Sequence, residues 1–177
     1  MQENYYNKFI NFFKKYNLYN KDLFNYIWNN SNFFNYLEED YRPYIGIYYK
    51  FDKKGRLMSF NLIVPFIDSN ETLLINIHEY LHAIFGYYYI GKRIRIDESC
   101  EVLSLLFEKL YLSNNKDEKL QNFKIALDNM ALKSNEEKYI LGLKVADELF
   151  DKIGEHPNLK KLYRKSKLLI KKYKYFN

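Results

Sequence analysis

His78-Glu79-Tyr80-Leu81-His82 is the most informative stretch of this sequence. Residues four apart lie one above the other on a helix, so His78 and His82 can both point an imidazole nitrogen at one ion about 2.0–2.1 Å away. Glu79 lies on the adjoining face, within reach of a water molecule activated by that ion. The pattern therefore predicts a helix that carries two metal ligands and a general base.

Apolar residues surround this motif at helical spacing. Leu74, Ile77, Leu81 and Phe85 form one stripe, which predicts a partly buried helix over about residues 71–88. A single histidine within such a stripe would be an ordinary core residue. Two histidines at this spacing, with a glutamate between them, favour a metal site.

A catalytic zinc ion uses three protein ligands and keeps one position open, so a third ligand is needed. His156 is the one histidine left and lies far downstream, which favours a carboxylate. Glu101 follows His82 after 18 intervening residues, enough for a loop and a second, antiparallel helix over about residues 96–112. Glu98 lies three residues before Glu101 and is the alternative third ligand.

The two predicted helices together resemble the thimet-oligopeptidase and oligoendopeptidase F group of zinc peptidases, in the gluzincin class. The resemblance rests on His-Glu-x-x-His followed by Glu101-x-x-Ser104-x-x-x-Glu108, and it covers roughly residues 56–148. It implies that Glu101 is the third ligand of one zinc ion per chain. It also implies hydrolysis of peptide bonds, with Glu79 taking a proton from water and delivering it to the leaving amine.

Other side chains are candidates for supporting roles. Ser104 and Glu108 are expected to contact the metal ligands, Glu108 by accepting a hydrogen bond from a ligand histidine. Members of the group use a downstream histidine and tyrosine to stabilise the oxyanion, and that segment has no counterpart here. His156 and Tyr139 are therefore the candidates for this role. Cys100, the only cysteine, lies beside acidic residues that disfavour a thiolate, so it is expected to be a small buried residue.

Two segments before the motif favour β-structure. Residues 44–50 and 56–66 are rich in Ile, Val, Tyr and Phe and flank the turn sequence Asp52-Lys53-Lys54-Gly55, which predicts a β-hairpin over about residues 44–66. In gluzincins the strand before the active-site helix presents an edge to which a peptide substrate adds. Residues 60–64 occupy that place, and Ser69 or Asn70 would cap the helix that follows.

The rest of the chain is expected to be helical. Aromatic and apolar stripes predict helices at about residues 3–18, 21–37, 117–132, 135–154 and 157–174. The expected fold class is therefore α+β and predominantly helical, with a minimal zincin-like core. The 177 residues, 47% of them hydrophobic, should form a single compact domain.

Composition and charge bear on location and partners. The sequence shows neither a signal peptide nor an apolar run of eighteen residues, and its single cysteine excludes an internal disulfide, so a cytoplasmic protein is expected. The net charge of +6 is concentrated in the last predicted helix. A basic amphipathic helix can bind nucleic acid or an anionic membrane, but it is more often a solvated face.

Two functions fit these features. The first is a zinc-dependent peptidase that acts on a peptide or protein substrate. The second is a regulatory binding module that retains a metalloprotease-like fold and engages a partner through its basic helix. Glu79 favours the peptidase, because a purely structural metal site has no use for a general base.

Overall fold

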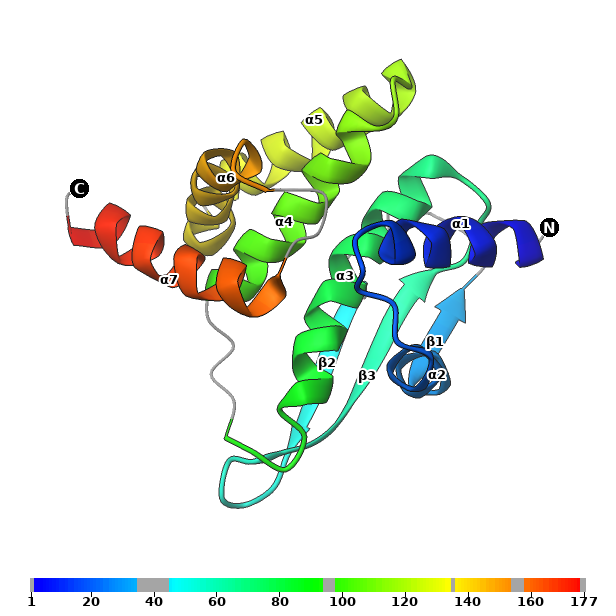
Figure 1. The fold of residues 1–177 in the computed structure, drawn as a ribbon, viewed down its shortest axis with the longest axis vertical. Helices are drawn as coiled ribbons and strands as arrows, with labels where there is room; N and C mark the ends of the chain where they lie inside the picture. Colours follow the sequence, from blue (N-terminus) through cyan, green and yellow to red (C-terminus); the bar gives the residue numbers. More distant parts are fainter. Residues whose placement is uncertain (1, 35–44, 94–97, 135, 154–157, 176–177) are drawn as a thin grey trace. The chain divides into compact units, whose positions relative to one another are not determined.

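The computed structural model describes residues 2–34, 45–93, 98–134, 136–153 and 158–175 (Figure 1). The chain divides into two compact units, Met1–Ile96 and Asp97–Asn177, each described by itself below. Seven helices and one three-stranded sheet lie within the described residues, which confirms the predicted α+β, mostly helical fold class. The single domain of residues 1–177 stays a prediction.

A mixed sheet of strand order β1-β3-β2 forms one layer of the first unit. β2 (Gly46–Phe51) and β3 (Leu57–Pro65) pair antiparallel and form the predicted hairpin. β1 (Ser31–Phe34) pairs parallel with β3 on its other side, from Ser31 opposite Leu62 to Phe34 opposite Pro65. β3 is therefore the central strand.

The predicted hairpin turn is confirmed, and Asp52 closes it. Its Oδ1 atom accepts hydrogen bonds from the backbone N–H groups of Lys54 and Arg56, both at 2.8 Å. Gly55 has φ +72°, a conformation that glycine adopts without strain. The Arg56 backbone N–H and then the Arg56 side chain hold the pKa of Asp52 below its usual range, despite some desolvation.

The helix predicted over residues 21–37 ends earlier than expected, so the prediction is wrong after Asn29. α2 (Lys21–Asn29) ends where polar side chains take the carbonyl groups that a further turn would use. The Asn30 side chain donates to the Tyr26 carbonyl at 2.8 Å, and the Ser31 hydroxyl donates to the Ile27 carbonyl at 2.6 Å. The chain then extends into β1, and residues 35–37 lie outside the described part.

The predicted substrate-binding edge at residues 60–64 is wrong for residues 62–64. Leu62, Ile63 and Val64 pair with β1 as well as with β2, so this part of β3 has no free edge. In the described ranges, the sheet ends at β1 on one side and at β2 on the other. The hairpin pattern could not show this, because the covering strand has only four residues and follows a helix directly.

The helix with the His-Glu-x-x-His motif, α3 (Asn70–Tyr88), packs on the sheet and against α1 (Gln2–Lys15) and α2 (Figure 1). Ser69 caps it as predicted, its hydroxyl accepting from the Thr72 N–H at 3.1 Å. Asn76 joins α3 to β3 and to α1: its side-chain amide donates to the Pro65 carbonyl at 2.8 Å and to the Tyr5 hydroxyl.

Tyr80, inside the motif, anchors α3 in an aromatic core. Its ring lies 4.7 Å from that of Phe9, 5.8 Å from Phe13 and 4.8 Å from Phe24, measured between centroids. Its hydroxyl donates to the Phe24 carbonyl at 3.1 Å. The aromatic stripes of the first two predicted helices thus form core, and they fix the rotation of α3 about its axis.

The second unit is helical and centres on α4 (Glu98–Ser113). α6 (Glu137–Phe150) and α7 (Leu159–Tyr175) pack on α4, and α5 (Glu118–Lys133) joins it through a buried ion pair. α4 is buried around most of its circumference, which is typical of a core helix. These helices match the four predicted for this region to within a few residues.

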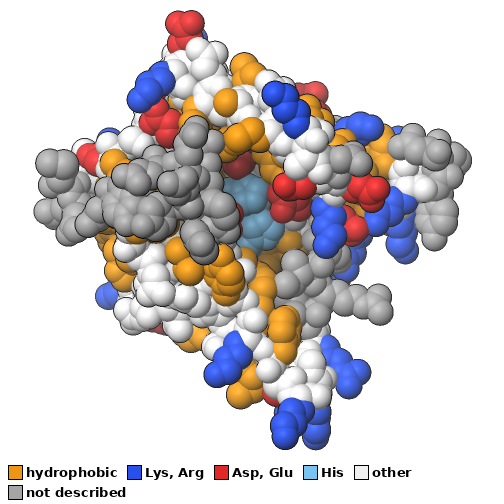
Figure 2. Space-filling model, turned by 180° about the vertical axis from the view of Figure 1, so that it is seen from behind, with side chains coloured by type: hydrophobic (Ala, Val, Ile, Leu, Met, Phe, Trp, Pro, Cys, Tyr) orange, Lys and Arg blue, Asp and Glu red, His pale blue; other side chains and the backbone are white. Residues whose placement is uncertain are grey.

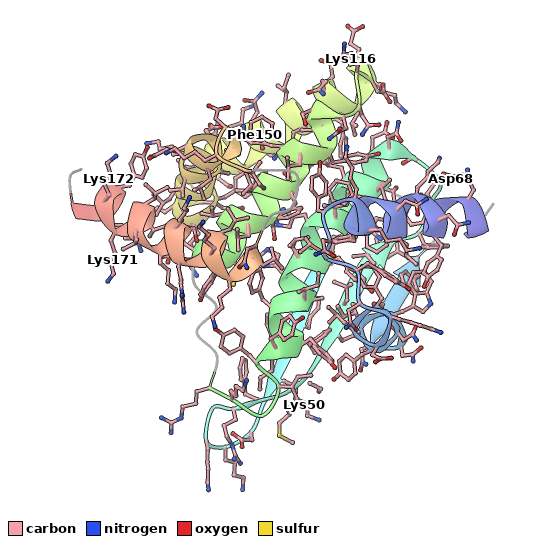
Figure 3. All side chains as sticks on the ribbon, in the orientation of Figure 1. Lys50, Asp68, Lys116, Phe150, Lys171 and Lys172 are labelled. Atoms are coloured by element: carbon pink, nitrogen blue, oxygen red, sulfur yellow. The ribbon has the colours of Figure 1, made fainter. Side chains whose placement is uncertain are left out.

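α7 separates apolar and basic side chains. Leu162, Ser166 and Ile170 are buried, whereas Lys171 and Lys172 point outward (Figure 3).

None of the helices in the described ranges has the length and apolar character needed to cross a membrane.

Candidate metal centre

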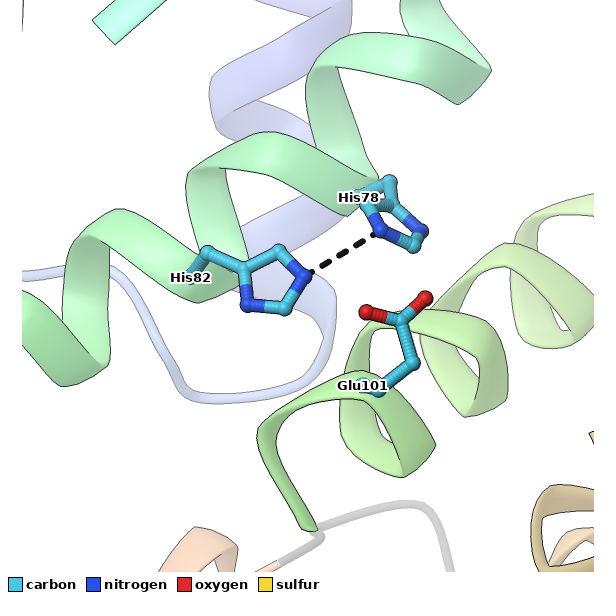
Figure 4. Close-up of side chains that lie close together, drawn as sticks. All are labelled: His78, His82 and Glu101. Carbon is cyan, nitrogen blue, oxygen red and sulfur yellow. Dashed lines mark hydrogen bonds between the residues drawn. The ribbon is translucent and has the colours of Figure 1, made fainter. Parts of the chain in front are cut away.

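The two histidines of the motif lie where one ion could contact both. On α3, His78 is half-buried and His82 is buried, and their Nε2 atoms are 3.2 Å apart (Figure 4). Two nitrogens that each bind one tetrahedral zinc ion at about 2.0–2.1 Å stand roughly 3.3 Å apart. The observed spacing is that of a hydrogen bond between the two rings, and it also fits two neighbouring ligands of one ion. Figure 2 shows histidine side chains at the molecular surface.

Glu79 lies beside the start of β2. A Cβ atom at Gly46 would stand 3.9 Å from Glu79 Oε2, an ordinary van der Waals distance, so the backbone at the start of β2 passes close to this carboxylate. Further along β2, the Tyr49 hydroxyl donates to the His82 backbone carbonyl at 3.3 Å. The edge strand β2 thus runs past the general base predicted from the sequence.

Glu101 lies in the first turn of α4 and is half-buried. His78 and His82 of the first unit and Glu101 of the second each offer one atom that can bind a metal ion (Figure 4). Two imidazoles and one carboxylate are a donor set that zinc accepts, and three protein ligands leave a fourth position for water or substrate.

Glu98, the alternative third ligand, is engaged elsewhere in the second unit. Its Oε1 atom accepts a hydrogen bond from Lys174 Nζ at 2.6 Å. This hydrogen bond is the main cause that holds the pKa of Glu98 below its usual range. The alternative would require Glu98 to give up this cation, which favours Glu101.

Glu108 and Tyr139, predicted as supporting residues, belong to a buried polar cluster around Lys124. The Lys124 ammonium group lies 2.6 Å from Glu108 Oε2 and 2.6 Å from Asp128 Oδ1. It also donates to the Tyr139 hydroxyl at 2.8 Å, and that hydroxyl donates to Asp128 at 2.8 Å. Glu108 thus neutralises a buried cation, and the Tyr139 proton is held by Asp128, which disfavours its predicted oxyanion role.

Burial and charge act together on this cluster. Burial alone would lower the pKa of Lys124, but the charges of Glu108 and Asp128 outweigh it and raise that pKa. Burial, followed by the same two carboxylates, raises the pKa of the Tyr139 phenol. The cluster therefore keeps a charged lysine and a neutral tyrosine inside the second unit at neutral pH.

The remaining predicted residues are placed as follows. Cys100 is buried, as expected. Ser104 is fully buried in α4, and its predicted contact with the metal ligands stays a prediction. His156 lies outside the described residues, so its candidate role in oxyanion stabilisation stays a prediction.

Two features of the site were not found from the sequence. Gly46 beside Glu79 gave no signal, because a glycine at the start of a strand fits many structures. Lys124 could have been found: it follows Leu120 by one helical turn on the buried stripe of α5, where a lysine needs a carboxylate partner.

Comparison with known proteins finds no relative of this chain. No family model, no curated protein and no solved structure matches the chain.

Proposed function

We propose that this protein is a zinc-dependent peptidase, with His78, His82 and Glu101 as metal ligands and Glu79 as the general base. The observation that carries the proposal is the 3.2 Å separation of the two Nε2 atoms, on a helix that also carries Glu79. The resemblance to the thimet-oligopeptidase and oligoendopeptidase F group supports the same assignment.

The donor set supports zinc as the metal. A zinc ion held by two imidazoles and one carboxylate supplies a Lewis acid that lowers the pKa of water toward ~7 and polarises a carbonyl group. The same three donors also suit iron(II), which some enzymes use to activate oxygen. Glu79 favours hydrolysis over that chemistry, because hydrolysis needs a base next to the metal.

Glu79 would move the proton in the proposed reaction. Its carboxylate is half-buried and lies close to the backbone of Gly46 at the start of β2. It would accept a proton from the attacking water and deliver it to the leaving amine nitrogen. This route needs no covalent intermediate with the protein.

β2 is the strand best suited to align a peptide substrate. It is an edge strand in the described part of the sheet, and its first residue lies beside Glu79. An extended peptide that adds to this edge would satisfy its own backbone hydrogen bonds and place its carbonyl groups near the general base. β2 thus takes the role that the sequence had suggested for residues 60–64.

Hydrolysis of a mixed peptide library by the Glu79→Gln variant tests the proposal. The substitution keeps the shape of the side chain but removes the base, so we expect a rate loss of at least about a hundredfold with the metal retained. Glu71→Gln, at the start of the same helix, is the matched control and should keep its rate. Equal rates in Glu79→Gln and the wild type would exclude the catalytic assignment. Metal binding without hydrolysis by the wild type would favour the binding module.

A further inference from the structure

Gly142 of α6 is buried against α4 at the level of Glu101. A Cβ atom at Gly142 would lie 3.2 Å from Glu101 Cγ, 3.8 Å from Glu101 Cβ and 2.8 Å from Leu105 Cδ1. Glycine destabilises a helix interior relative to alanine, so a glycine here needs a reason in the packing. The reason is that α4 and α6 approach closely here, so that only a glycine leaves room for the side chains of Leu105 and Glu101. Glu101 is the proposed third ligand.

We infer that Gly142 is a positioning residue, which sets the placement of the Glu101 carboxylate by leaving room for its side chain. This inference rests on the proposed function. A contact of 3.2 Å is tighter than ordinary van der Waals contact, so a methyl group at position 142 would push Glu101 Cγ by a few tenths of an ångström. The carboxylate is bonded to Cγ and would move with it.

Metal sites are sensitive to displacements of this size. Ligand distances in protein sites hold to within about 0.2 Å of their preferred values. A displaced Glu101 would therefore bind the ion less well, even though the helices still form. Groups that hold metal ligands in place typically change metal affinity by about 10–100-fold when they are altered.

A packing effect through Leu105 is the competing explanation, because this fully buried side chain is the nearer neighbour of Gly142. The two explanations differ in what happens when Glu101 is absent. In Glu101→Ala the Cγ atom is gone, and the remaining Cβ would be at an ordinary contact distance of 3.8 Å. The contact with Leu105 is unaltered. A double-mutant cycle between positions 142 and 101 therefore separates the two explanations.

The experiment measures Zn²⁺ affinity by competition with a chromophoric chelator. The proteins compared are the wild type, Gly142→Ala, Glu101→Ala and the double variant, with circular dichroism to monitor folding. We expect Gly142→Ala to bind Zn²⁺ about 10–100-fold more weakly than the wild type. In the Glu101→Ala background, the same substitution should change the affinity no further. Val145→Ile is the matched control, because it adds one carbon at another fully buried position of α6, and it should bind like the wild type.

Each other outcome overturns the inference in a recognisable way. An unchanged affinity in Gly142→Ala would remove the positioning role and leave the proposed function intact. An equal loss with and without Glu101, or an equal loss in Val145→Ile, would assign the effect to general helix packing. A wild type that binds no Zn²⁺ would overturn the proposed function and this inference together.

Discussion

Gly46 and Glu79 face each other across the contact between β2 and α3: a Cβ atom on the glycine would stand 3.9 Å from Glu79 Oε2. Gly46 also has φ +147°, which other residues rarely adopt. The backbone of an edge strand thus passes close to the proposed base without a side chain between them. In the proposed reaction, a substrate carbonyl would approach the base along this strand.

Gly46→Ala should reduce peptide hydrolysis while the metal is retained. The new methyl group would enter the space beside Glu79, and the strained backbone would shift the start of β2. A displacement near 1 Å at a reacting centre can lower the rate by about a hundredfold, and we expect a loss of at least tenfold in kcat/KM. Gly55→Ala is the control, because Gly55 also has a positive φ (+72°) but lies in the hairpin turn. Similar activity losses in both variants would show that backbone strain alone causes the loss.

Gly86→Ala should destabilise the first unit, although alanine favours helices. A Cβ atom there would lie 3.0 Å from Tyr49 Cε1 and 3.2 Å from Phe60 Cδ1, because α3 lies close against the hairpin. Overpacking of this kind costs typically about 1–3 kcal/mol, more than the roughly 0.5–1 kcal/mol that alanine contributes to a helix interior. Urea unfolding followed by circular dichroism measures the difference. A variant more stable than the wild type would mean that the helix and the sheet are less closely packed.

The buried cluster around Lys124 should make the protein sensitive to alkali. The pKa values of Lys124 and Tyr139 are both raised in the folded state, so the folded chain keeps protons that the unfolded chain loses. Their contribution to stability is complete below the unfolded pKa values of about 10–10.4 and is lost as pH rises through the folded values. The free energy of unfolding should therefore fall above about pH 10.

Tyr139→Phe tests this origin of the alkaline sensitivity. It removes one of the titrating groups, so the free energy of unfolding should fall less steeply between about pH 9 and 11 than in the wild type. Tyr48→Phe, at a side chain that is 47% exposed, is the control and should keep the wild-type slope. Identical slopes in all three proteins would show that Tyr139 does not contribute.

Local signals in the sequence explain which parts of the fold could be predicted. The cap at Ser69, the turn at Asp52 and the stripe around Tyr80 each depend on residues a few positions apart, and the corresponding elements were predicted within a few residues. β1 is different: its pairing partner Leu62 lies 31 positions after Ser31, and nothing local distinguishes it from the end of a helix. β3 is the central strand because β1 pairs with it, so its central position was not predicted either.

The candidate site shows the same limit. His78, Glu79 and His82 fall within one helical turn, so the spacing alone brought them together. The partners of Glu98, Glu108 and Tyr139 are side chains on other helices, which a pattern along one helix cannot reveal. Glu108 was predicted to accept a hydrogen bond from a ligand histidine, and it pairs with Lys124; Glu98 pairs with Lys174.

The metal content of the purified protein tests the central claim most directly. Elemental mass spectrometry on protein prepared without added zinc should find about one zinc ion per chain in the wild type and in Glu98→Ala. His82→Ala and Glu101→Ala should lose it. Zinc that is retained in Glu101→Ala but lost in Glu98→Ala would move the third ligand to Glu98. A wild type that contains iron, or that binds no zinc after reconstitution, would contradict the assignment of a zinc peptidase.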